Sequence, residues 1–85
     1  MTEAMLLKKC RLIGAKVKYY RNLCGMHQTE LADELGISFQ YLSRIETGRQ
    51  TPSLPLLMDI AEQLKVSLAK LVRDARLLFS GVSGK

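Results

Sequence analysis

Gln40 and Arg44 are the side chains with the clearest chemistry in this chain, because they lie four residues apart in a segment whose pattern predicts a helix. An amide can donate to and accept from adenine, and a guanidinium can bind the two acceptors of guanine. At 100° per residue, five side chains of this segment fall within an arc of about 140°. These residues are Phe39, Gln40, Ser43, Arg44 and Thr47. The segment is therefore a candidate for reading the edges of base pairs.

Phe39 needs a separate explanation, because its ring has no hydrogen bond to offer. It can pack against the methyl group of a thymine. The alternative is that the whole arc consists of ordinary solvated residues, but an exposed Phe is unusual on such a surface. We therefore favour contacts with bases at Phe39, Gln40, Ser43 and Arg44.

Two short crossed helices are the elements that would position this arc, and residues 28 to 47 have their apolar spacing. Gly36 would end the first helix in the left-handed conformation, and Ile37 would fill the corner. Ser38 is a good N-cap for the second helix. The apolar stripes are Leu31, Ala32 and Leu35 on the first helix, and Leu42 and Ile45 on the second.

The segment HQTELADELGISFQYLSRIETGRQTPSL resembles the Cro/C1 (XRE) family of helix-turn-helix regulators, and the likeness covers roughly residues 12 to 72. Its most specific features are Gln28, the combination of Ser43, Glu46 and Gly48, and Pro52. The resemblance implies an all-α, five-helix, lambda-repressor-like DNA-binding domain. It also implies a recognition helix over residues 38–46 that enters the major groove.

The resemblance further implies that Gln28 binds a phosphate and braces the start of the recognition helix. It places Arg21 and Glu46 in a structural salt bridge, although Arg21 can also reach a phosphate. A surface role for Gln28 is the alternative. Further phosphate contacts are expected at Tyr41, Arg49 and Thr51, with Tyr41 equally suited to the core.

The first helix is expected to begin after Thr2 and to continue to Gly25, because apolar residues recur at alternating steps of four and three. Gly14 interrupts this seam at a cost of about 1 kcal/mol relative to Ala, so a break there is the alternative. We favour one continuous helix. The apolar positions are Leu6, Cys10, Ile13, Val17, Tyr20 and Cys24.

Two more helices are expected after the motif. Ser53 can cap a helix that runs to about Lys65 and tolerates Pro55 in its first turn. Ser67 can cap a fifth helix, and residues 80–85 have the composition of a flexible tail. The apolar stripe of the fifth helix is Leu68, Leu71, Val72, Ala75, Leu78 and Phe79.

A chain of 85 residues with 47% hydrophobic and 25% charged residues is expected to form one domain over 1–85. The net charge is +5, but residues 28–48 carry one basic and four acidic side chains. Attraction to a polyanion must therefore come from the flanks and from helix N-termini. The first helix holds Lys8, Lys9, Arg11, Lys16 and Lys18, which are either a solvated face or a source of non-specific DNA attraction.

The sequence gives little support for metal binding or catalysis. Cys10 and Cys24 have no metal-ligand spacing and are expected to be reduced core thiols. His27, the single histidine, is expected to be a weak cap or a phosphate contact and has no nucleophile beside it. We therefore expect no metal, no cofactor and no enzymatic activity. No stretch has the length of a membrane span, so we expect a cytoplasmic protein with no membrane partner.

These observations favour a sequence-specific transcriptional regulator, and more specifically a repressor of a pseudo-palindromic operator in double-stranded DNA. A homodimer would read two half-sites about 34 Å apart. The dimer surface is expected at Leu68, Leu71, Val72, Leu78 and Phe79. The alternative for these residues is docking onto Leu6 and Leu7 of the first helix. The rival function is a protein-interaction adaptor or antitoxin-like partner protein that uses its apolar C-terminal helix.

Overall fold

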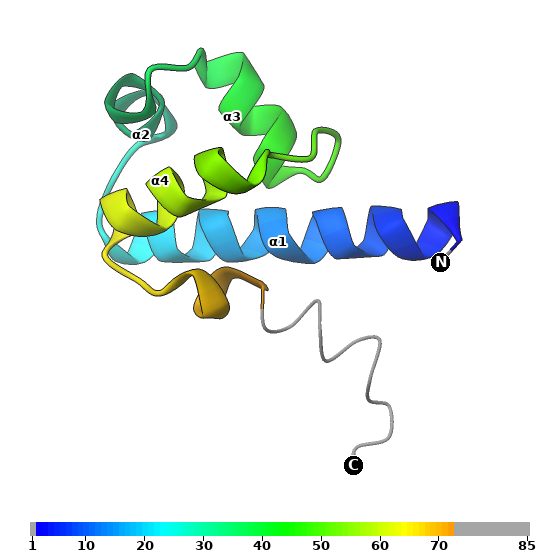
Figure 1. Cartoon of the computed structure of the whole chain (residues 1–85). Helices are drawn as coiled ribbons and strands as arrows, with labels where there is room; N and C mark the ends of the chain where they lie inside the picture. The colour runs from blue at the N-terminus through cyan, green and yellow to red at the C-terminus, as the bar shows by residue number, and fades with distance from the viewer. Residues whose placement is uncertain (1, 73–85) are drawn as a thin grey trace.

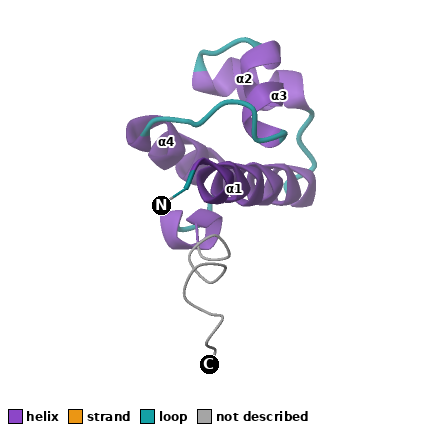
Figure 2. Ribbon diagram, turned by 90° about the vertical axis from the view of Figure 1, so that its right-hand side faces the viewer, coloured by secondary structure: helices purple, strands orange, loops and turns teal. Residues whose placement is uncertain are grey.

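The computed structural model describes residues 2–72. It contains the helices α1 (Glu3–Leu23), α2 (Gln28–Leu35), α3 (Phe39–Glu46) and α4 (Leu54–Leu64), and residues 68–72 begin a fifth helix (Figure 1). No strand occurs within residues 2–72. The all-α expectation is therefore confirmed. In Figures 1 and 2, α2 and α3 lie on one side of α1, and the helix that begins at residue 68 lies on the other side.

The first helix is continuous, as expected, and it passes through Gly14 without a break. It begins at its predicted cap, where the amide of Met5 donates to Oγ1 of Thr2 at 3.2 Å. The reason for a glycine in mid-helix is tertiary. A Cβ atom on Gly14 would collide with the carbonyl oxygen of Ile45 and lie 2.8 Å from that of Glu46. Gly14 therefore lets the backbone of α1 approach the C-terminal end of α3.

The turn between α2 and α3 has the helix-ending glycine and the capping serine that the sequence predicts. Gly36 adopts the left-handed conformation, with φ of 73°. The amide of Ile37 donates to the carbonyl of Ala32 at 3.0 Å, which closes the end of α2. The amide of Tyr41 donates to Oγ of Ser38 at 3.1 Å, so Ser38 caps α3. These local bonds define the angle at which the chain enters α3.

The fourth helix starts at its predicted cap, because Oγ of Ser53 accepts from the amide of Leu56 at 3.2 Å. Pro55 stands in the first turn, where the missing amide costs nothing. The helix ends when Lys65 takes a left-handed conformation, with φ of 59°. It supplies much of a core whose largest fully buried side chains are Val17, Leu31, Leu42, Ile45, Ile60, Leu64 and Leu71.

Leu71 corrects the expected dimer surface. Its side chain is 0% exposed within a single chain, where it belongs to the same core cluster as Val17 and Ile60. The chain therefore buries Leu71 by itself, and no second copy is needed to cover it. Leu68 and Val72 are half-buried against the same core. Leu78, Phe79 and the tail at 80–85 lie outside the described residues.

The alternative of docking onto Leu6 depends on residues outside the described part of the chain and stays a prediction, whereas one thiol differs from expectation. Leu6 is 49% exposed, so the described part of the chain does not cover the start of α1. Cys10 is buried, as predicted, whereas Cys24 is exposed because it lies at the end of α1. Between residues 2 and 72, the helices are too short or too polar to cross a membrane.

Candidate nucleic-acid interface

The outward face of α3 presents the side chains with base-reading chemistry. Gln40 and Arg44 are exposed, Phe39 is 45% exposed, and Ser43 is half-buried. The opposite face of α3 is anchored because Leu42 and Ile45 are fully buried. The burial pattern thus leaves an amide and a guanidinium free to approach a ligand.

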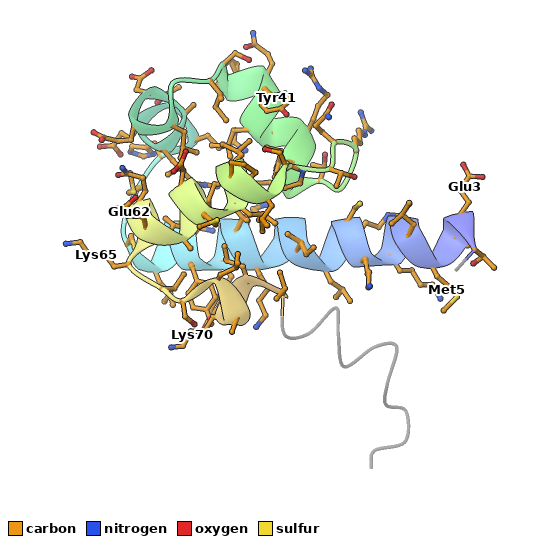
Figure 3. The ribbon with its side chains drawn as sticks, in the orientation of Figure 1. Glu3, Met5, Tyr41, Glu62, Lys65 and Lys70 are labelled. Atoms are coloured by element: carbon orange, nitrogen blue, oxygen red, sulfur yellow. The ribbon has the colours of Figure 1, made fainter. Side chains whose placement is uncertain are left out.

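Tyr41 lies beside Arg44 on this surface. The guanidinium carbon of Arg44 is 5.8 Å from the centroid of the Tyr41 ring, within the range of a cation–π contact. Tyr41 is half-buried and is labelled on α3 in Figure 3. The ring therefore supports the guanidinium, which limits its rotamers. The hydroxyl of Thr47 donates to the carbonyls of Ser43 and Arg44, at 3.0 and 3.3 Å, so it is bound to the helix end.

A buried network behind α3 holds the helix in place. Nε of Arg21 donates to Oε2 of Glu46 at 2.7 Å, and Nη2 donates to Oε1 at 3.1 Å. The remaining Nη1 donates to the carbonyl of Met26 at 2.7 Å. Both charged residues are buried, at 7% and 6% exposure. The bidentate geometry satisfies the planar guanidinium and ties α1 to the end of α3.

Gln28 extends this network to α2. Its Nε2 donates to Oε1 of Glu46 at 2.9 Å. One carboxylate therefore joins the start of α2, the end of α3 and the last turn of α1. The resemblance implied the pair of Arg21 and Glu46, but sequence reasoning missed the bond from Gln28, since 18 residues separate it from Glu46. The position of Gln28 in the first turn of α2 was the available signal.

The N-terminus of α2 lies next to this network. The amide of His27 donates to Oε1 of Glu30 at 2.8 Å, so a carboxylate stands at the first turn of the helix. His27 is exposed at the cap position and Gln28 is half-buried. The positive end of the helix dipole and an amide side chain thus lie together at one edge of the surface.

The turn after α3 forms the other edge. The amide of Arg49 donates to the carbonyl of Arg44 at 2.8 Å, and the Arg49 side chain is exposed. Oγ1 of Thr51 lies 2.9 Å from Sγ of Cys10, a contact that binds the turn to α1. The predicted phosphate residues therefore fall at two edges of the α3 surface, one at Gln28 and one at Arg49 and Thr51.

The described residues give little support to metal chemistry. Within 2–72, no group of three or more His, Cys, Asp or Glu side chains is placed to hold an ion. The surface offers hydrogen-bond donors, acceptors and cations, which are the groups that bind nucleic acid.

Comparison with known proteins agrees with this geometry. A family model described as a helix-turn-helix, HTH_3, matches residues 17–71. The chain belongs to this helix-turn-helix family. The resemblance to Cro/C1 (XRE) regulators is thereby confirmed. The HTH_3 match begins inside α1 and ends in the fifth helix, so it includes every residue of the surface described above.

Named relatives in the HTH_3 family are transcriptional regulators. The chain is 35% identical to the HTH-type transcriptional regulator SlrR of Bacillus subtilis over 74 residues, which are 86% of this chain and 49% of SlrR. It thus spans about half the length of that relative. The clp gene regulator ClgR of Corynebacterium glutamicum has a similar structure, with a TM-score of 0.74, 32% identity, and coverage of 78% of this chain and 70% of that one. The structure of a SinR protein/SinI protein complex matches with a TM-score of 0.66 and 34% identity, over 85% of this chain and 84% of that one.

Proposed function

We propose that this protein is a sequence-specific DNA-binding transcriptional regulator, acting as a cytoplasmic repressor without catalytic activity, and that α3 enters the major groove. The observation that carries the proposal is the contrast between the two faces of α3. Gln40 and Arg44 are exposed, while Leu42 and Ile45 are buried and Glu46 is held by hydrogen bonds. A rigid helix with a polar outward face is what direct readout requires.

The base contacts follow from the chemistry of each side chain. Gln40 pairs with adenine and Arg44 with guanine, and each bidentate contact contributes about 1–3 kcal/mol of discrimination. Phe39 packs against a thymine methyl, and Ser43 completes the base-reading set. Phosphates on the two sides of the groove are bound by Gln28, Tyr41, Arg49 and Thr51.

Binding as a homodimer is part of the proposal, because one helix of eight residues contacts few base pairs. Two copies related by a two-fold axis would place two α3 helices in successive major grooves, about 34 Å apart. The operator is then pseudo-palindromic. Leu68 and Val72 keep exposed surface for the partner copy, whereas Leu71 is withdrawn into the core.

The test is selection from a random duplex library at about 0.15 M salt, near physiological ionic strength. We expect enrichment of an inverted repeat whose half-sites are about 10–11 base pairs apart. The double variant Gln40→Ala/Arg44→Ala should fold normally and lose the sequence preference. The control Glu62→Ala/Lys70→Ala changes exposed polar residues elsewhere and should enrich the same repeat. Retention of the preference by the α3 variant would refute the proposed contacts.

A second candidate function is a protein-interaction adaptor or antitoxin-like partner. Its support is the set of large apolar side chains left exposed on α1 and α4, which are Met5, Leu6, Tyr19, Leu23, Leu54 and Met58. The related SinR protein has also been solved in complex with the SinI protein. If the folded chain enriches no duplex, and a specific protein co-purifies with it in a way that depends on these side chains, the adaptor function replaces the repressor.

A further inference from the structure

The basic side chains of α1 are not equivalent, and one of them lies against the turn that follows α3. Resting on the DNA-binding function proposed above, we propose that Arg11 is a phosphate-binding residue that extends the DNA contact surface from α3 onto α1. Sequence reasoning placed Arg11 in a general basic face of five side chains, with no specific role.

The contact between Arg11 and Gly48 positions the guanidinium. Gly48 is buried in the turn after α3, with φ of 82°. A Cβ atom at Gly48 would lie 2.6 Å from Cγ of Arg11 and 2.9 Å from its Cα. The aliphatic stem of Arg11 therefore packs directly on the turn, while the residue as a whole stays exposed. This is the arrangement of a long basic side chain that buries its stem and leaves its charge in water.

Two other arginines belong to neighbouring segments, Arg44 to the last turn of α3 and Arg49 to the turn itself. Arg49 follows Gly48 in the chain, and its amide donates to the carbonyl of Arg44 at 2.8 Å. Both side chains are exposed. Arg11 and Arg49 therefore come from the two segments that meet at Gly48, next to the C-terminal end of the proposed recognition helix. Figure 1 shows this turn over the part of α1 that leads toward its N-terminus.

Two other cations of α1, Lys16 and Lys18, are placed differently. Nζ of Lys16 lies 5.9 and 5.7 Å from the ring centroids of Tyr19 and Tyr20, so those rings position it. Lys18 is seven residues from Arg11, which corresponds to about 10 Å along the helix axis. The packing against Gly48 therefore distinguishes Arg11 from Lys16 and Lys18.

Few acidic groups are available to neutralise the three arginines. The sequence has no Asp or Glu between residues 4 and 29 or between 47 and 58. Glu46 is already bound by Arg21 and Gln28. Because residues 28–48 carry a net charge of −3, a phosphate backbone approaching α3 needs cations from neighbouring segments. Arg11 and Arg49 supply them on this edge.

A structural role is the competing explanation. A cation near the C-terminus of α3 would also interact favourably with the helix dipole. The two explanations differ in one measurable property, because a phosphate contact releases counterions from DNA and a dipole interaction within the protein does not.

The experiment measures the salt dependence of binding for the full chain on the duplex enriched by selection, using fluorescence anisotropy from 50 to 200 mM salt. Each copy of the proposed homodimer loses one phosphate contact, so Arg11→Gln should reduce the slope of log K against log salt by about 1.8. The affinity deficit of Arg11→Gln should therefore shrink by about twelvefold across this salt range. The deficit should be similar on an unrelated duplex, since phosphates carry no sequence information. Arg11→Lys should restore most of the slope.

Lys70→Gln is the matched control, because it removes the same charge from an exposed side chain. Figure 3 shows Lys70 on the side of α1 away from α3. The slope of log K against log salt for Lys70→Gln should equal that of the unchanged chain. If Arg11→Gln has the slope of the control but a lower melting temperature, the residue is structural and the proposal is overturned. If the chain binds duplexes without sequence preference, the proposed regulator function fails, while the slopes still decide whether Arg11 binds phosphate. Absence of any duplex binding at 50 mM salt would overturn both.

Discussion

Replacing Gly14 with alanine sets two physical effects against each other at one position. In an isolated helix, the change from Gly to Ala stabilises by about 1 kcal/mol. In this fold, the added methyl group would collide with the carbonyl oxygen of Ile45 and lie 2.8 Å from that of Glu46. Because both obstacles are backbone atoms, a rotamer change cannot relieve the contact.

The expected magnitude follows from this geometry. Ordinary contact begins at 3.4 Å, so α1 and the end of α3 must separate by at least 0.6 Å at Glu46. Overpacking of this kind costs about 1–3 kcal/mol, and rigid backbone on both sides favours the upper end. Subtracting the gain of about 1 kcal/mol in helix propensity leaves an expected net decrease of about 2 kcal/mol in the free energy of unfolding. That corresponds to a fall in melting temperature of about 8–16 °C for a domain of this size.

Urea unfolding followed by circular dichroism measures the effect. Ala15→Gly is the control, because Ala15 is exposed in the next position of the same helix. Ala15→Gly should lower the free energy of unfolding by about 1 kcal/mol through helix propensity alone. If Gly14→Ala instead gains about 1 kcal/mol, α1 and α3 do not approach closely and the packing described here is wrong. A shift of α3 should also weaken DNA binding in conditions where the variant remains folded.

Three further changes test other parts of the structure. Arg21→Met would leave the Glu46 carboxylate buried without its cation. We therefore expect urea unfolding to show a free energy of unfolding about 3–5 kcal/mol lower. The double variant Arg21→Met/Glu46→Leu should recover much of this loss. A double variant no more stable than the single one would contradict this. Ser38→Ala removes the cap on the amide of Tyr41 and should cost about 1 kcal/mol in thermal unfolding, while Ser38→Asn should stay close to the original stability. Leu71→Ala should cost about 2–5 kcal/mol with no change in oligomeric state by light scattering, and dissociation of a dimer without loss of monomer stability would argue against its place in the core.

Local sequence was sufficient for the helix boundaries and for the face that α3 exposes. Ser38 and Ser53 cap their helices, and Gly36 ends α2 in the left-handed conformation, as the sequence predicts. These features depend on residues within about four positions of each other, where side-chain and backbone chemistry act directly. The period of the apolar residues likewise separates the buried Leu42 from the exposed Gln40.

Only the tertiary structure decided which distant residues meet. Sequence could assign a propensity cost to Gly14, but the benefit comes from the carbonyl groups at the end of α3, some thirty positions away in the chain. The same holds for the bond from Gln28 to Glu46 and for the packing of Arg11 on Gly48. The apolar stripe of the fifth helix was evident, yet periodicity cannot say whether a stripe covers its own core or a second copy. The Leu71 side chain is buried in the core of the same chain, because α1 and α4 leave an apolar surface that residues 68–72 can reach.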